Sequence, residues 1–167
     1  AAIISDTLLF RSPTCTPVDE KTAEKLAKIA EIDMEEMSME MFNAGSNLKG
    51  KSARDLLFQD FKQFTVNDTT FGVGQINSMN VEELSEIKDM LVPYIPQVLE
   101  SVHLEQIYFM LTDILNESTE LLCFGPDARS SIISAFDLPE DTDRILLKGV
   151  VSRKKQLIPT LVSAMQQ

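Results

Sequence analysis

Hydrophobic and polar positions in the first third of the chain follow the spacing of helices. Thr16-Pro17-Val18-Asp19 puts a hydroxyl cap before a proline, with an acid in the first turn, and this arrangement is typical of a helix start. We expect that helix to run to about Ile32. Asp33 can cap a second helix, which would end near Gly45 and have an apolar face of Met34, Met37, Met41 and Phe42.

The next stretch, residues 44–51, is small and polar and contains two glycines. Such a composition is typical of a connection between domains, because it has little to bury and adopts many backbone conformations. We therefore predict a domain boundary here, with one domain ending in residues 1–45 and another formed by residues 46–167.

Strand-like patterns dominate the middle of the chain. Two runs rich in β-branched and aromatic residues, 61–66 and 70–79, flank Asn67-Asp68, which predicts two strands joined by a hairpin turn. Residues 107–114 and 121–124 are short apolar runs between polar ones, as expected of strands covered on both faces.

Helical patterns separate and follow these strands. Asn80 precedes two glutamates, and apolar residues recur at three- and four-residue steps as far as Val102, which predicts a long amphipathic helix. Pro93 and Pro96 should kink or end that helix. Residues 127–136 also have a helical pattern.

A last strand and helix complete the pattern. Residues 145–147 and 149–151 read as a strand that feeds a terminal helix, whose apolar stripe would consist of Leu157, Ile158, Leu161, Val162 and Met165. Strands that alternate with helices in this way indicate a layered α/β domain.

Composition and charge argue against several classes of function. The 167 residues carry 26 acidic and 15 basic side chains, a net charge of −11, and such a surface repels the phosphates of nucleic acids. No apolar run approaches the roughly 18–20 residues of a membrane span. Cys15 and Cys123 fit no zinc or redox motif, so we expect free thiols in a reducing cytoplasm. The apolar start, Ala1-Ala2-Ile3-Ile4, leads us to expect a piece of a longer protein.

Asp6 is the first candidate for a functional residue, because it lies inside an apolar run. Burial of an unpaired carboxylate there would cost much free energy. Two interpretations stay open, since Asp6 can cap a short helix that begins at Thr7 or can bind a metal ion. The only histidine, His103, has no Asp or Cys at ligand spacing, and we do not expect it to be catalytic.

Basic residues supply the other candidates. Lys62 lies on a predicted strand in an acidic region, where it can also be an ordinary outward-facing residue. From Arg144 onwards there are five basic residues and no acid, and Ser152-Arg153-Lys154-Lys155-Gln156 lies at the predicted strand-to-helix junction. Backbone N–H groups at a helix start and an arginine fork both suit a phosphate, although a solvated surface cluster remains the alternative.

Four stretches carry a family resemblance. They are Ile4-Ser5-Asp6-Thr7-Leu8-Leu9-Phe10-Arg11-Ser12-Pro13-Thr14-Cys15-Thr16, Asp60-Phe61-Lys62-Gln63-Phe64, Leu111-Thr112-Asp113-Ile114-Leu115 and Gly149-Val150-Val151-Ser152-Arg153-Lys154-Lys155-Gln156. With them, essentially the whole chain resembles the C-terminal part of a family II, manganese-dependent inorganic pyrophosphatase of the DHH phosphoesterase superfamily. The resemblance implies that residues 1–45 are the helical end of the N-terminal DHH domain. Residues 46–167 would then form the C-terminal substrate-binding domain, a mixed β-sheet flanked by helices.

The resemblance also implies roles for single residues. Asp6 matches the last metal-ligand aspartate of the family, and Lys62, Arg153 and Lys154 match its catalytic, substrate-binding bases. The other metal ligands of the family lie upstream of this sequence. The implied cofactor is Mn²⁺, with Co²⁺ or Mg²⁺ as alternatives. The implied activity is hydrolysis of pyrophosphate to two phosphates by a metal-activated water, in which the bases supply charge and positioning.

Two alternatives to this function remain. An exopolyphosphatase of the same superfamily shares the domain plan and differs in the length of polyphosphate that its cleft accepts. The isolated 167 residues would be a noncatalytic phosphate-binding module, because one metal ligand cannot hold a two-metal site. The family dimerises through its N-terminal domain, so a homodimeric parent is implied and a monomeric fragment is allowed. An inserted pair of regulatory CBS domains in the parent is left open.

Overall fold

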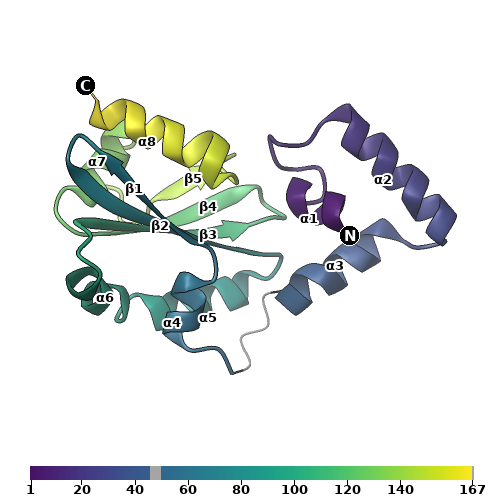
Figure 1. The fold of residues 1–167 in the computed structure, drawn as a ribbon, viewed down its shortest axis with the longest axis horizontal. Helices are drawn as coiled ribbons and strands as arrows, with labels where there is room; N and C mark the ends of the chain where they lie inside the picture. Colours follow the sequence, from purple (N-terminus) through teal and green to yellow (C-terminus); the bar gives the residue numbers. More distant parts are fainter. Residues whose placement is uncertain (46–49, 167) are drawn as a thin grey trace.

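A single mixed β-sheet forms the centre of the structure, a computed structural model that describes residues 1–45 and 50–166 (Figure 1). Within these residues five strands lie side by side in sequence order: β1 Phe61–Val66, β2 Thr69–Ser78, β3 Gln106–Asp113, β4 Ser118–Phe124 and β5 Leu146–Lys148. β2 and β3 are parallel, and each other neighbouring pair is antiparallel. Helices cover both faces (Figure 1), so the predicted fold class is confirmed.

The predicted hairpin is the connection between β1 and β2. Asn67 and Asp68 have φ values of 47° and 68°, and two central residues with positive φ match the right-handed twist of the paired strands. Phe64 then stacks on Phe71 across the pair, with ring centroids 5.5 Å apart. The turn residues and the aromatic pair therefore set the register of this hairpin.

One face of the sheet is covered by α4 Ala53–Phe58, α5 Val81–Leu91 and α6 Ile95–Ser101. α5 begins as predicted, because the side-chain oxygen of Asn80 accepts hydrogen bonds from the N–H groups of Glu82 and Glu83. Pro93 and Pro96 lie at the break between α5 and α6, as expected of prolines. α4 was not predicted, although a side-chain capping box marks its start. The fully buried side chains on this face include Leu57, Ile87, Ile95 and Phe109.

The opposite face is covered by α7 Ala128–Ala135, the π-helical turn η1 Arg153–Leu157 and α8 Ile158–Met165. The predicted helix over residues 127–136 and the predicted terminal helix are both confirmed. The prediction that residues 149–151 continue the last strand is wrong. Gly149 has a φ of 75°, which turns the chain out of β5 directly after Lys148.

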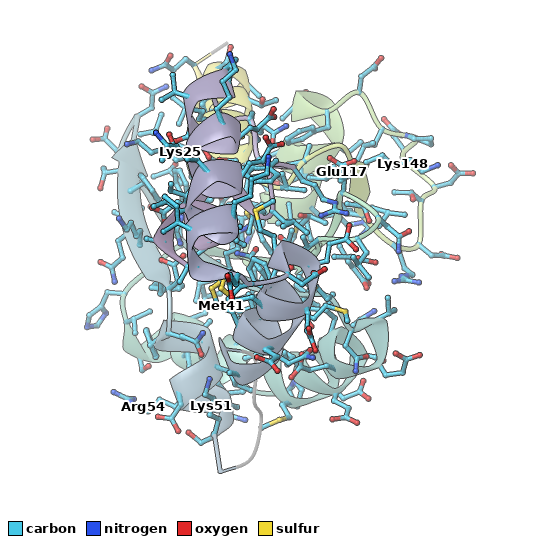
Figure 2. The ribbon with its side chains drawn as sticks, turned by 90° about the vertical axis from the view of Figure 1, so that its right-hand side faces the viewer. Lys25, Met41, Lys51, Arg54, Glu117 and Lys148 are labelled. Carbon is cyan, nitrogen blue, oxygen red and sulfur yellow. The ribbon has the colours of Figure 1, made fainter. Side chains whose placement is uncertain are left out.

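The N-terminal segment contains α1 Ala2–Thr7, α2 Pro17–Ala30 and α3 Met34–Gly45. Thr16 forms the predicted cap together with Asp19, and Asp33 accepts from two N–H groups at the start of α3. These helices pack at one end of the sheet (Figures 1 and 2), through a buried cluster of Ile4, Leu8, Phe42, Ile114 and Val151. Of the predicted linker, residues 46–49 lie outside the described residues. Within the part of the chain that is described, no helix is long and apolar enough to cross a membrane.

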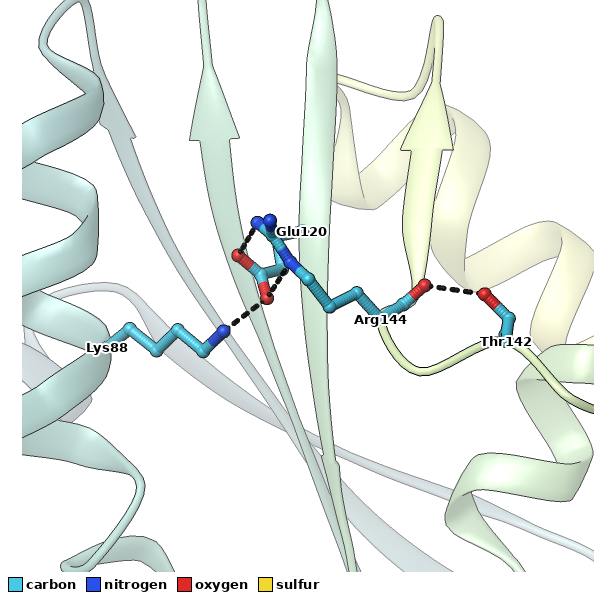
Figure 3. A network of polar contacts seen from close by, with 4 residues as sticks. All are labelled: Lys88, Glu120, Thr142 and Arg144. Atoms are coloured by element: carbon cyan, nitrogen blue, oxygen red, sulfur yellow. Dashed lines mark hydrogen bonds and ion pairs between the residues drawn. The ribbon is translucent and has the colours of Figure 1, made fainter.

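A three-residue ion-pair network links α5 to the sheet on the α4–α6 face (Figure 3). The Glu120 carboxylate, 15% exposed, lies 2.6 Å from Lys88 Nζ and 2.6 Å from Arg144 Nη2. Arg144 Nε donates a second hydrogen bond to the same carboxylate over 3.1 Å. Burial raises the pKa of the Glu120 carboxyl, but hydrogen bonds from Arg144 and Lys88 outweigh that effect and leave the pKa below its usual range.

We predict that Glu120→Gln lowers the free energy of unfolding by about 2 kcal/mol at neutral pH, the usual scale for hydrogen bonds to charged groups. Because the folded-state pKa is lowered, this stabilisation is present above the ordinary glutamate pKa of about 4.3. It is lost as the pH falls through the lower folded-state pKa. Urea unfolding of wild type and variant, at neutral pH and in acid, measures the difference.

The matched control is Glu117→Gln, because Glu117 is exposed and makes no ion pair among the described residues (Figure 2). It removes the same charge three positions away and should change the free energy of unfolding by less than about 0.5 kcal/mol. Equal effects of both variants, or a Glu120→Gln effect that persists unchanged in acid, would show that the network does not stabilise the fold.

Candidate functional site

A shallow cleft lies between α1 and the start of η1, at the carboxyl end of β2. It is lined by Ser5, Asp6, Leu8, Ser12, Thr14, Gln75, Asn77, Val151, Ser152, Arg153 and Lys154. We call it the Asp6–Arg153 cleft. It brings together three of the four residues singled out in the sequence, from opposite ends of the chain. The carboxyl ends of strands are where open α/β sheets usually bind ligands.

Asp6 reaches this cleft from the last turn of α1. The prediction that it caps a helix starting at Thr7 is wrong, since the helix starts earlier and Ala1 occupies the cap position. The premise of a buried carboxylate is also wrong. Ile4 and Thr7 turn their side chains into the protein, and Asp6 is therefore exposed. A carboxylate near a helix C-terminus gains nothing from the helix dipole.

The backbone after α1 has an uncommon conformation. Leu8, Leu9 and Phe10 have φ values of 50°, 52° and 67°, in the left-handed region that costs a non-glycine residue about 1 kcal/mol. The Thr7 hydroxyl donates to the Ile3 carbonyl over 2.7 Å and accepts from the Phe10 N–H over 3.2 Å. This turn folds the following segment back, so that the Thr14 hydroxyl donates to the Asp6 carbonyl over 3.0 Å.

On the other side of the cleft, the Gln156 side chain organises the approach to η1. Its Oε1 accepts from the N–H groups of Val151 and Ser152, both over 2.9 Å, and its Nε2 donates to the Gly149 carbonyl over 2.6 Å. Ser152 Oγ in turn accepts from the Lys155 N–H over 3.2 Å. Two N–H groups at the junction that were expected to face an anion are therefore occupied by Gln156, and the charged side chains remain.

The same segment is tied to the sheet by buried and half-buried polar groups. Gln75 Nε2 donates to the Val151 carbonyl over 3.0 Å, and Thr119 Oγ1 donates to the Val150 carbonyl over 2.6 Å. Thr112 links the two, because its hydroxyl lies 3.1 Å from Gln75 Nε2 and 2.9 Å from the Thr119 hydroxyl. Both threonines are fully buried. This network holds the backbone that carries the basic side chains.

Arg153 is largely buried, with 12% of its side chain exposed. Its Nη1 donates to the carbonyls of Asp60 and Val73 over 2.7 and 3.2 Å, and its Nη2 donates to Asp60 Oδ1 over 2.8 Å. Lys154 is exposed and has no hydrogen-bond partner within the described ranges. Lys155 Nζ reaches the Pro13 carbonyl over 3.3 Å, which joins η1 to the N-terminal segment.

Lys62 lies beside the cleft and does not line it. It is exposed on the edge strand β1 and is paired in register with Val73, whose carbonyl accepts from Arg153. Because residues opposite each other in an antiparallel pair share a face, Lys62 is on the face that η1 and α8 cover. The structure therefore puts Lys62 on the same face of the sheet as η1, opposite the residue whose carbonyl binds Arg153.

The remaining candidates lie elsewhere. His103 is exposed in the turn between α6 and β3 and does not line the cleft. Cys15 and Cys123 are free thiols, as expected, and burial raises the pKa of Cys123 to about 12. Among the described residues, no group of three or more His, Cys, Asp or Glu side chains could hold a metal ion. Asp6 on its own therefore offers at most one ligand.

Sequence reasoning missed Gln75 and Asn77, which line both the cleft and an adjoining hollow that Asp60 also lines. Gln75 Nε2 donates to Asn77 Oδ1 over 2.9 Å. A signal was available, since two amides at positions i and i+2 of a mostly apolar strand share one face of the sheet. Polar side chains on a buried strand need partners, and here the partners are at the cleft.

The chain is similar to proteins that are named inorganic pyrophosphatases. The chain is 47% identical over 162 residues to a cobalt-dependent inorganic pyrophosphatase of Clostridium perfringens, covering 96% of this chain and 29% of the relative. It is 42% identical over 168 residues to a manganese-dependent inorganic pyrophosphatase of Methanothrix thermoacetophila, covering 100% of this chain and 54% of the relative. The chain thus spans about half the length of such relatives, or less.

A solved structure has the same fold. It is a Methanococcus jannaschii protein assigned to the family II inorganic pyrophosphatases, with a TM-score of 0.84 and 36% identity, over 99% of this chain and 53% of that one. Residues 39–164 match the family described as the DHHA2 domain. Because this match takes in about three quarters of the sequence, the chain belongs to the DHHA2 domain family, and its resemblance to the C-terminal part of the family II inorganic pyrophosphatases is confirmed.

Proposed function

We propose that this chain supplies the substrate-binding domain, and one metal ligand, of an enzyme that hydrolyses inorganic pyrophosphate. The observation that carries the proposal is the Asp6–Arg153 cleft, where a carboxylate from α1 meets two cations from η1. The relatives that the chain resembles are named inorganic pyrophosphatases, which supports the same substrate for the parent of this chain.

The bases act on the substrate by charge and position. Arg153 presents a planar fork that matches two phosphate oxygens, and Lys154 adds a mobile point charge in the same cleft. Lys62 supplies a third positive charge from β1, on the face of the sheet that η1 covers. Together they neutralise the negative charge that moves to the leaving phosphate during cleavage of the P–O bond.

Asp6 fits a role as one ligand of a hard divalent cation, because it is an exposed carboxylate at the edge of the cleft. The proposed metal is Mn²⁺, with Co²⁺ or Mg²⁺ as alternatives, and the names of the relatives support manganese or cobalt. The remaining ligands are proposed to lie outside this chain. When bound, the metal supplies an activated water as the nucleophile.

The proposed domain division is residues 1–45 as the end of a catalytic domain and residues 46–167 as the substrate-binding domain. An apolar groove between α1, α2 and α3 supports this, since Leu26, Ile29 and Ile32 are 53%, 71% and 42% exposed, and such a patch usually contacts another surface. A homodimeric parent in the cytoplasm completes the proposal, and the two free thiols support a reducing compartment.

Arg153→Ala in the full-length protein should lower kcat for pyrophosphate about 100-fold, the usual scale for one charge-stabilising donor. Lys148→Ala is the matched control, because Lys148 belongs to the same basic C-terminal region, is exposed and does not line the cleft. Phosphate release under saturating pyrophosphate measures both variants. Unchanged kcat in Arg153→Ala would remove Arg153 from the site, and an equal loss in both variants would indicate a general charge effect.

Asp6→Asn in the full-length protein should weaken Mn²⁺ binding at least tenfold, because an amide oxygen replaces a charged ligand. Titration of the metal-free protein with Mn²⁺, followed by electron paramagnetic resonance, measures the affinity without any turnover. Glu24→Gln removes the same charge from the exposed surface of α2 and should leave the affinity unchanged. Equal Mn²⁺ affinity in wild type and Asp6→Asn would contradict the ligand role.

The isolated 167-residue chain should release negligible phosphate from pyrophosphate, whereas the full-length protein should hydrolyse it with Mn²⁺ present. The physical reason is that one carboxylate cannot hold a metal site for the nucleophile. Parallel assays of both proteins with pyrophosphate and tripolyphosphate test this. Preference of the full-length protein for tripolyphosphate would indicate an exopolyphosphatase, and hydrolysis of neither would indicate a noncatalytic phosphate-binding module.

A further inference from the structure

Arg153 donates three hydrogen bonds to acceptors among the described residues. A guanidinium has five N–H donors in a fixed plane. Nη1 donates to the carbonyls of both Asp60 and Val73, and Nη2 donates one hydrogen bond to Asp60 Oδ1. Within the described residues, the Nε–H and the second N–H of Nη2 have no acceptor. These two form the side edge of the guanidinium, whose two parallel N–H bonds suit a pair of phosphate oxygens.

The acceptors that hold the other edge belong to a rigid part of the fold. The Asp60 carbonyl accepts from the Gln75 N–H over 3.2 Å as well as from Arg153 Nη1, so it is fastened to β2. Gln75 itself binds the Val151 carbonyl through its side chain. The groups that hold the guanidinium and the groups that hold its own backbone are thus parts of one hydrogen-bonded unit.

We propose that Asp60 is a positioning residue for substrate binding. It holds the guanidinium of Arg153 by its Nη1/Nη2 edge, so that the Nε/Nη2 edge presents a fixed fork to one phosphate group in the Asp6–Arg153 cleft. The inference rests on the proposed function, because the phosphate is taken to be part of pyrophosphate. Its physical advantage is preorganisation, since a long side chain that is already ordered loses little entropy when the substrate binds.

The opposite interpretation makes Asp60 a competitor, whose carboxylate occupies Arg153 until the substrate displaces it. Two features favour positioning instead. Two of the three acceptors are main-chain carbonyls, which cannot leave without unpairing the hairpin. The Asp60 side chain, 51% exposed, faces the adjoining hollow and is not among the residues that line the cleft. The carboxylate therefore binds the edge of Arg153 away from the proposed phosphate.

The test is Asp60→Ala in the full-length protein, which should lower kcat/KM for pyrophosphate about tenfold, the scale of one charge-assisted hydrogen bond. Asp60→Asn keeps an acceptor oxygen without its charge and should lose less. Asp89→Ala is the matched control, because Asp89 is exposed on α5 and has no hydrogen-bond or ion-pair partner among the described residues. Removal of one negative charge at Asp89 should leave kcat/KM unchanged.

A double-mutant cycle distinguishes positioning from a purely structural role. If Asp60 acts through Arg153, Asp60→Ala should have no further effect on kcat/KM once Arg153 is alanine. An additive loss, or a fall in the melting temperature that accounts for the lost activity, would overturn the proposal. So would unchanged or increased kcat/KM in Asp60→Ala, and an increase would identify Asp60 as a competitor.

Failure of the proposed function gives a different pattern. If wild type hydrolyses pyrophosphate and Arg153→Ala does so about 100-fold more slowly, the proposed function stands whatever Asp60→Ala does. If wild type releases no phosphate from pyrophosphate, the proposed function fails and the role of Asp60 fails with it.

Discussion

The arrangement of the whole site depends on how residues 149–156 are held against the end of the sheet. Thr119 and Gln75 donate to the carbonyls of Val150 and Val151 from the sheet face that η1 and α8 cover. Losing either donor would leave a buried carbonyl unpaired, at about 1–3 kcal/mol. The side chain of Val151 meanwhile packs in the cluster formed with Ile4, Leu8 and Phe42. The backbone of Val150 and Val151 thus binds the segment to the sheet, and the side chain of Val151 binds it to the N-terminal helices. This double attachment brings α1 and η1 to one cleft.

The charged side chains form two kinds of cluster, one that ties parts of the fold together and one that leaves positive charge in the cleft. At Glu120 one carboxylate pairs with both Lys88 and Arg144, and these ion pairs tie α5 to β4. At Arg153 the pairing differs, because the carboxylate of Asp60 binds only one nitrogen of the cation and Lys154 stays unpaired among the described residues. A small positive cleft in a chain of net charge −11 attracts a compact anion, while the surrounding field repels long polyanions.

Local sequence rules were sufficient for most of the fold. The hairpin at Asn67-Asp68, the cap at Asn80 and the break at Pro93 each depend on a residue whose preferred backbone or hydrogen bond is a property of its own segment. The elements that were missed or misread have mixed causes. α1 has no capping side chain, whereas α4 begins with a local capping box and the positive φ of Gly149 turns the chain out of β5.

The site shows the same division between local and long-range causes. Residue types and a family resemblance identified Asp6, Lys62, Arg153 and Lys154 as candidates. Neither indicates which way each side chain points in the folded chain. Asp6 faces the cleft because the residues around it on α1 pack against Ile114 and Val151, which lie over a hundred positions away along the chain. Gln75 is important because its side chain binds the Val151 carbonyl, and not because of any residue near it in the sequence. A polar side chain on a buried strand therefore indicates that a partner exists, and only the three-dimensional fold identifies that partner.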